Sequence, residues 1–150
     1  MKEVISIPAS RTQDIIKEYL IHAHPHPRSY KDAQFMTFRK VGGYMDALYS
    51  VQHELIIKPR SNGFEDQLEY LRDDFKKRLL GYIRERKHGF GFGEKDEYKF
   101  YFLKVEQSLD HLPKPIEGNG QSHTYYTYEE IISGKSEIIR ESVLNKRHKK

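Results

Sequence analysis

The chain contains no cysteine and no tryptophan among its 150 residues. The absence of cysteine excludes a disulfide framework, thiolate zinc sites and cysteine nucleophiles together. No apolar run approaches the ~20 residues that a membrane-spanning helix needs. The opening segment MKEVISIPAS carries an acid at Glu3 and has no long hydrophobic core, unlike a signal peptide. We therefore expect a cytoplasmic protein without a membrane partner.

A net excess of one charge is found only at the C-terminal end. The formal net charge is +4, and the last six residues, NKRHKK, carry four positive charges and no acid. Residues 1–144 are therefore neutral overall. We expect residues 1–144 to form a single domain, since a chain of this length suits one hydrophobic core, and residues 145–150 to form a basic flexible tail. Such a tail can contact phosphate without reading sequence.

Aromatic residues supply much of the apolar content, with 11 Tyr and 8 Phe in a chain that is 37% hydrophobic and 32% charged. This composition is too rich in aromatic and β-branched residues for a disordered protein. Because charged residues are so frequent, the apolar side chains must be concentrated on few faces of the fold.

The periodicity of apolar residues predicts both strands and helices. Strands are expected over residues 4–8, 34–40, 44–57 and 98–105. Helices are expected over residues 11–22 and 64–87, after Thr127, and for a turn or two near residues 138–144. Few strands with segregated helices indicate an α+β domain, built on a small curved β-sheet or barrel with helices packed outside.

Local signals refine this prediction. The Gly42-Gly43 pair between two strand segments indicates a hairpin, and Thr127 with Glu130 forms a capping box. In the second strand of the hairpin one face is expected to be the core face, and it comprises Ala47, Tyr49, Val51, His53, Leu55 and Ile57.

Three segments together resemble the PUA-like superfamily, and within it the EVE- and ASCH-type small barrels of bacteria and phages. They are FMTFRKVGGYMDALYSVQHELIIKP (residues 35–59), YKFYFLKVEQSLDHLPKPI (residues 98–116) and YTYEEIISGK (residues 126–135). The G-x-K-x-x-E-x-R motif associated with ASCH domains is absent, as is the tryptophan-containing opening common in EVE domains. Neither subfamily is assigned on these residues.

The resemblance implies a module that associates with RNA or DNA and holds a base or modified base in an aromatic pocket. A flipped base needs ring faces for stacking and a few hydrogen-bonding groups for its edge. The residues expected to bind the ligand are the aromatics Phe38, Tyr44, Tyr49, Phe90 and Phe92 with the cations Arg28, Arg39 and Lys40. Phe90 and Phe92 lie between glycines and indicate a mobile flap, whereas Phe38 and Tyr49, each taken alone, are better explained as ordinary core residues.

The segment IHAHPHPR places His22, His24 and His26 on alternate positions. In an extended chain, neighbours on one face are about 7 Å apart, so the three imidazoles do not easily converge on one metal ion. We expect His22 to belong to the preceding helix, and Pro25 and Pro27 to impose a polyproline-like connector that positions Arg28. No metal and no cofactor is predicted.

Two other function classes remain open. Glu97-Tyr98-Lys99 has the E-x-K form of metal-dependent nuclease cores, in which a carboxylate holds a divalent ion, although a further aspartate one strand earlier is not evident. A protein-interaction adaptor, in a phage or bacterial defence system, would use the helix expected over residues 64–87. The glycine-rich segment GFGFG lacks a G-K-[ST] ending, so it is not a nucleotide P-loop. The leading prediction is non-catalytic binding of nucleic acid or a nucleotide-like ligand.

Overall fold

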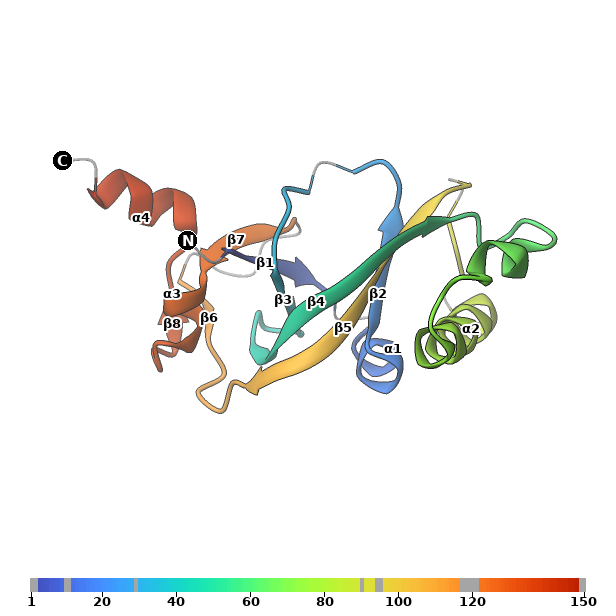
Figure 1. Ribbon diagram of the computed structural model, residues 1–150. Coiled ribbons are helices and arrows are strands. Elements are labelled where there is room, and N and C mark those ends of the chain that lie inside the picture. The colour runs from blue at the N-terminus through green and yellow to red at the C-terminus, as the bar shows by residue number, and fades with distance from the viewer. Residues whose placement is uncertain are drawn as a thin grey trace. The chain divides into compact units, whose positions relative to one another are not determined.

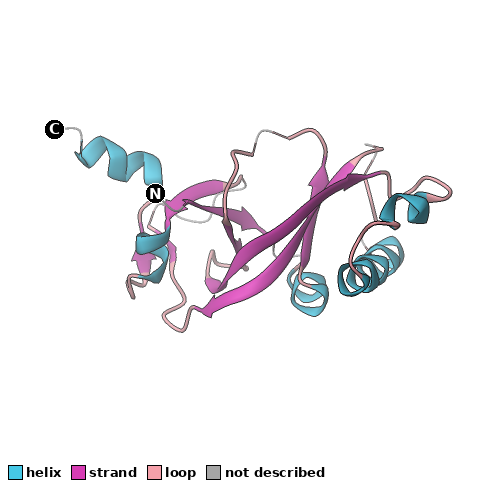
Figure 2. Cartoon of the chain, viewed as in Figure 1, coloured by secondary structure: helices cyan, strands magenta, loops and turns pink. Residues whose placement is uncertain are grey.

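A computed structural model describes residues 3–9, 12–28, 30–89, 91–93, 96–116 and 122–148, without the side chains of 145–148. The elements are β1 (Glu3–Pro8), α1 (Gln13–Tyr19), β2 (Ile21–Pro25), β3 (Phe35–Arg39), β4 (Met45–Ile57), the 3-10 helix η1 (Phe64–Leu68), α2 (Asp73–His88), β5 (Tyr98–Ser108), β6 (Lys114–Pro115), β7 (Thr124–Thr127), α3 (Tyr128–Ile132), β8 (Glu137–Ile138) and α4 (Glu141–His148) (Figure 1). Figure 2 distinguishes the helices from the strands.

The strands described form a six-stranded sheet in the order β2-β5-β4-β3-β1-β7 and a two-stranded sheet of β6 and β8. The α+β prediction with a curved sheet is confirmed, and the described strands do not close into a barrel. The chain divides into two compact units. Unit 1 comprises Met1–Gln13, Asp32–Val51 and Lys104–Lys150, and unit 2 comprises Asp14–Lys31 and Gln52–Leu103. None of the helices in the described part of the chain combines the length and apolar character that crossing a membrane requires.

In unit 1, β1 pairs in parallel with β3 and antiparallel with β7, and β3 pairs antiparallel with the first part of β4. The predicted hairpin between β3 and β4 is confirmed. Gly42 and Gly43 have φ angles of +91° and +89°, which side chains rarely tolerate, and the Lys40 N–H donates to the Tyr44 carbonyl across the turn.

A core and a capped helix complete unit 1. The core residues are Val4, Phe35, Met45, Leu48, Leu109, Tyr126, Ile131 and Ile138. The Thr127 hydroxyl accepts a hydrogen bond from the Glu130 N–H at 3.2 Å, so the predicted cap of α3 is confirmed. This cap satisfies one backbone donor that the first turn of a helix otherwise leaves without a partner.

In unit 2, β2 pairs antiparallel with β5, from Ile21 opposite Phe102 to Pro25 opposite Tyr98. Helix α2 buries Phe75, Leu79, Tyr82 and Ile83 in the core. Two arginines of α2 reach backbone carbonyls. Arg78 donates to the carbonyls of Tyr19, Leu20 and Leu103, and Arg86 donates to those of Ala23 and Gly91. These guanidinium groups tie α2 to the chain around β2.

The predicted helix over residues 11–22 is right over residues 13–19 and wrong over its last three residues. Helix α1 ends at Tyr19, Leu20 takes a positive φ of 55°, and β2 follows at once. The polyproline-like connector predicted from Pro25 and Pro27 is also wrong at Pro25, because residues 21–25 are a strand of the main sheet. Pairing with β5 satisfies the backbone groups of this segment, and alternate residues Ile21 and Ala23 enter the core of unit 2.

Two further predictions need correction. The single helix expected over residues 64–87 is divided into η1 and α2, and the break lies where Arg72 is extended (ψ 146°) before Asp73 and Asp74 start α2. These two acids suit the positive end of the helix dipole. The expected core face of β4 is right at Tyr49 and Ile57, which are buried, but it wrongly includes His53, which is exposed, and omits Leu48, which is fully buried.

Candidate nucleic-acid interface

The residues that the sequence predicted for ligand binding lie in both units. In unit 1, Phe38 and Tyr49 pack against each other with ring centroids 5.5 Å apart. They are 2% and 4% exposed, so neither presents a free ring face. Burial, reinforced by Asp46, raises the pKa of Tyr49, and this hydroxyl therefore stays protonated. Both rings position the β3–β4 hairpin from within.

Arg39 is also interior, with 1% of its surface exposed. Its guanidinium donates to the Ser6 carbonyl at 3.3 Å, to the Ser6 hydroxyl at 3.2 Å, and to the Ser122 carbonyl. Hydrogen bonds from a charged donor are stronger than neutral ones, and they let a guanidinium lie inside a protein. Arg39 thus connects β3 to β1 and to the segment that leads into β7.

The surface of the hairpin carries the other two predicted residues of unit 1. Tyr44 is 40% exposed, and the Lys114 ammonium lies 5.4 Å from the centroid of its ring. The Lys40 ammonium is 2.7 Å from a carboxylate oxygen of Asp46. An accessible ring with lysines on the same hairpin and on β6 is a surface that can take a base and its phosphate.

Unit 2 contains a column of side chains in contact that leads from the surface to the interior. The guanidinium of exposed Arg28 lies 5.6 Å from the centroid of Tyr30, which is half-buried. The Tyr30 ring meets His24 at 4.5 Å between centroids, and the planes are inclined by 63°. His24 in turn lies 2.8 Å from the Tyr101 hydroxyl through Nε2. We call Arg28, Tyr30, His24 and Tyr101 the Tyr30 column.

The imidazole in this column has a defined protonation state. The pKa of His24 is lowered to about 4, mainly because the ring is buried. The hydrogen bond to the Pro25 carbonyl raises the pKa, and the positive charges of Arg28 and Lys99 lower it. Nδ1 lies 2.8 Å from the Pro25 carbonyl, which can only accept. Neutral His24 therefore donates through Nδ1 and accepts the Tyr101 hydroxyl proton at Nε2. Burial also lowers the pKa of His22 well below its ordinary value, so this imidazole is neutral too.

Sequence reasoning missed Tyr30 and Tyr101, which hold the column together. A signal was present in the alternation of residues 21–25, since His22 and His24 share one face of a strand if that segment is extended. The partner residue Tyr101 lies 77 positions away, and only the pairing of β2 with β5 brings it close.

The remaining predicted residues lie in the segment after α2. Phe92 is half-buried, meets Tyr98 edge-on at 4.9 Å between centroids, and lies 4.6 Å from the Arg86 guanidinium. This ring is held against the core of unit 2. Phe90 lies outside the described residues.

The lysine of the E-x-K segment, Lys99, forms an ion pair with Glu54. The Lys99 ammonium is 2.6 Å from a carboxylate oxygen of Glu54 and 5.3 Å from the centroid of Tyr101. Glu97 is exposed, and its backbone carbonyl accepts from the His26 N–H. Among the residues that the structure describes, no three His, Asp or Glu side chains are grouped closely enough to hold a metal ion.

Comparison with known proteins identifies the fold. No protein-family model matches the chain, and no curated protein matches it significantly. The crystal structure of ASCH from Zymomonas mobilis superposes with a TM-score of 0.50 and 9% sequence identity, over 92% of this chain and 97% of that one. A mutant of the same protein gives a TM-score of 0.44 and 10% identity, over 85% and 89%. The chain therefore has the fold of the ASCH structure from Zymomonas mobilis, a fold of the type that its sequence segments predicted.

Proposed function

We propose that this protein binds single-stranded nucleic acid, without catalysing a reaction on it, and that a base stacks on the Tyr30 column. The observation that carries the proposal is the arrangement of Arg28, Tyr30 and His24, in which an exposed cation and a half-buried ring are supported from the interior by an imidazole. Bases in single strands are bound by aromatic rings and guanidinium planes, and phosphates by exposed cations.

The support beneath Tyr30 matters for affinity. The His24 ring lies against Tyr30. Two hydrogen bonds fix this ring, because Nδ1 donates to the Pro25 carbonyl and Nε2 accepts from the Tyr101 hydroxyl. The tyrosine ring is therefore oriented before the ligand arrives, which reduces the entropy lost on binding. Because the pKa of His24 is about 4, the imidazole is neutral at physiological pH, and the positive charge of the column belongs to Arg28.

The hairpin of unit 1 provides a second contact surface for the same ligand class. Tyr44 presents a ring that is 40% exposed, and Lys40 and Lys114 lie beside the hairpin turn. Phe38, Tyr49 and Arg39 act in this proposal as residues that position the hairpin, because their side chains are interior. Phe92 fixes the segment after α2 through its contact with Arg86.

Salt dependence tests this proposal. Labelled DNA and RNA oligomers of ~12 nucleotides are titrated by fluorescence anisotropy at ~50 and ~200 mM salt. We expect saturable binding that weakens with salt, and Arg28→Gln should reduce the slope of log affinity against log salt by about one. Lys17→Gln removes an exposed cation elsewhere in unit 2 and is the matched control.

Three results would contradict the proposal. The first is failure of every oligomer to bind. The second is binding that is indifferent to salt, because phosphate contacts then contribute nothing. The third is an equal loss in Lys17→Gln and Arg28→Gln, because affinity would then follow total charge rather than the Tyr30 column.

A further inference from the structure

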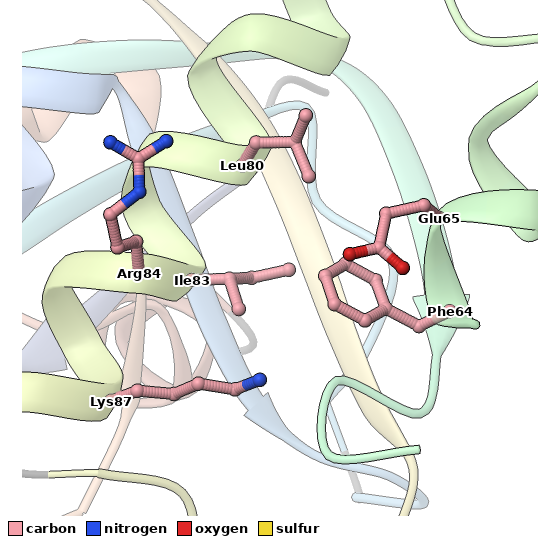
Figure 3. A pocket seen from close by; sticks show the side chains of 6 residues that line it. All are labelled: Phe64, Glu65, Leu80, Ile83, Arg84 and Lys87. Atoms are coloured by element: carbon pink, nitrogen blue, oxygen red, sulfur yellow. The ribbon is translucent and has the colours of Figure 1, made fainter. Parts of the chain in front are cut away.

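A hollow of about 380 Å³ lies between η1 and α2 within unit 2. Its apolar lining is formed by Phe64, Leu80 and Ile83, and its charged lining by Glu65, Arg84 and Lys87. Figure 3 shows that Leu80 and Ile83 extend from α2 toward the side of the hollow that carries Phe64 and Glu65. The Lys87 ammonium extends to the same side, whereas the Arg84 guanidinium turns away.

The burial of these residues separates a floor from a rim. Phe64 and Ile83 are buried and Leu80 is half-buried, so they form an apolar floor. Glu65, Arg84 and Lys87 are exposed at the rim, which therefore carries two cations and one carboxylate, and of the two cations the Lys87 ammonium extends toward Phe64. The negative end of the α2 dipole lies nearby, but positive side chains in the last turn oppose it. The hollow therefore favours a group that is apolar at its centre and acidic at its edge.

The ring in the floor is not a stacking platform. Phe64 is 7% exposed, and the Lys87 ammonium lies 5.3 Å from its centroid. Leu80 and Ile83 have no π face. A nucleobase would consequently find little to stack on, whereas an aliphatic or aromatic side chain of a protein fits a floor of this composition. The volume lies at the small end of the range for ligand sites, about 300–1,000 Å³, which suits an anchoring side chain.

We propose that this hollow receives an apolar side chain from an acidic peptide segment of a partner protein, whose carboxylates contact the Lys87 ammonium at the rim. The interval from Leu80 to Lys87 spans about 10 Å of helix, which equals about three residues of extended peptide. The basic C-terminal residues of this chain have the wrong charge for this rim, which argues against them as the occupant.

Synthetic peptides test the proposal on the full chain. The probe is a fluorescein-labelled decapeptide of glutamates with a central phenylalanine, and its partners carry a central alanine, or glutamines in place of the glutamates. We expect saturable binding of the first peptide. The alanine peptide should bind at least about tenfold more weakly, because the anchor is lost. The glutamine peptide should also bind more weakly.

The charge-removing variants should act in opposite directions. Lys87→Gln should weaken binding of the glutamate peptide by up to about fivefold, and Glu65→Gln should strengthen it by a similar factor. Lys77→Gln removes another exposed cation of α2 outside the hollow and should leave the affinity unchanged. All three positions are exposed, so the fold is preserved, and circular dichroism checks this.

Several outcomes overturn the proposal. They are the absence of binding by the glutamate peptide, equal affinity for the phenylalanine and alanine peptides, and equal effects of Lys87→Gln and Lys77→Gln. Binding of an oligonucleotide that is weakened by Lys87→Gln and spared by Lys77→Gln, without peptide binding, would assign the hollow to nucleic acid instead. The hollow does not include Arg28 or Tyr30, so this result and the test of nucleic-acid binding are independent.

Discussion

The neutral imidazole of His24 makes the stability of the protein depend on pH. The pKa of His24 is about 4 in the folded chain because the ring is buried, against an ordinary value of about 6.5 in an unfolded chain. As the pH falls below 6.5, His24 becomes protonated in the unfolded state but stays neutral in the folded state. Stability is therefore fully present above pH 6.5 and is lost as the pH falls toward 4.

The magnitude follows from the two pKa values. Between pH 7 and pH 5 the free energy of unfolding should fall by about 2 kcal/mol through His24 alone. The lowered pKa of His22 adds a loss of the same sign. Solvent near exposed Arg28 weakens the effect of burial on His24. We therefore expect His24 to lower the free energy of unfolding by about 1–2 kcal/mol between pH 7 and pH 5.

Urea unfolding at pH 7 and pH 5 measures this effect. His24→Gln removes the titrating group, so the difference between the two pH values should shrink by about 1–2 kcal/mol relative to the wild type. His88→Gln removes an exposed histidine at the end of α2 and should leave the difference unchanged. If His24→Gln keeps the full pH dependence of the wild type, His24 is not buried in its neutral form and the reasoning is refuted.

Three substitutions test the packing of the fold by urea unfolding. Gly81→Ala places a Cβ 2.5 Å from the Tyr19 ring, and stability should drop by about 1–3 kcal/mol; an unchanged midpoint would show that the ring moves freely. Thr127→Ala removes the oxygen that caps α3 and should lower stability by about 1 kcal/mol, whereas Thr127→Ser retains the cap and should lose less. Arg78→Met removes the donor to three carbonyls and should lower stability by about 1–3 kcal/mol; equal stability would mean that water replaces the guanidinium.

The parts of the fold that the sequence predicted correctly depend on local interactions. The hairpin is encoded by two adjacent glycines with positive φ, and the cap of α3 by two residues three positions apart. Strand β5 was evident because its aromatic residues are bulky on both faces. Each of these features is decided within a few residues, so it can be deduced without knowledge of the tertiary structure.

The missed features depend on distant partners. Strand β2 contains only five residues, and they form a strand because they pair with β5. The sequence alone favoured a helix up to His22 and a connector at the prolines. The same pairing gathers Tyr101 with His24, and the segment after β2 adds Tyr30. Periodicity also continued through the break between η1 and α2, where the backbone of Arg72 is extended.

The interior arginines illustrate why residue type alone did not define the site. Arg39 was expected to meet a ligand because arginines recognise phosphate and bases, yet its guanidinium is buried against Ser6 and Ser122. Arg86 similarly donates to the carbonyls of Ala23 and Gly91. Backbone carbonyls left without a strand or helix partner need a donor, and a long guanidinium side chain supplies several at once.

The affinity of the Tyr30→Ala variant for a single-stranded oligomer tests the account most directly. Loss of one stacking ring should weaken binding by about 1–3 kcal/mol, or roughly five- to 150-fold. Tyr30→Phe retains the ring and should bind like the wild type, and Tyr70→Ala removes a tyrosine of unit 2 that is 97% exposed and lies outside the column. Wild-type affinity in Tyr30→Ala, or the same loss in Tyr70→Ala, would contradict the claim that a base stacks on Tyr30.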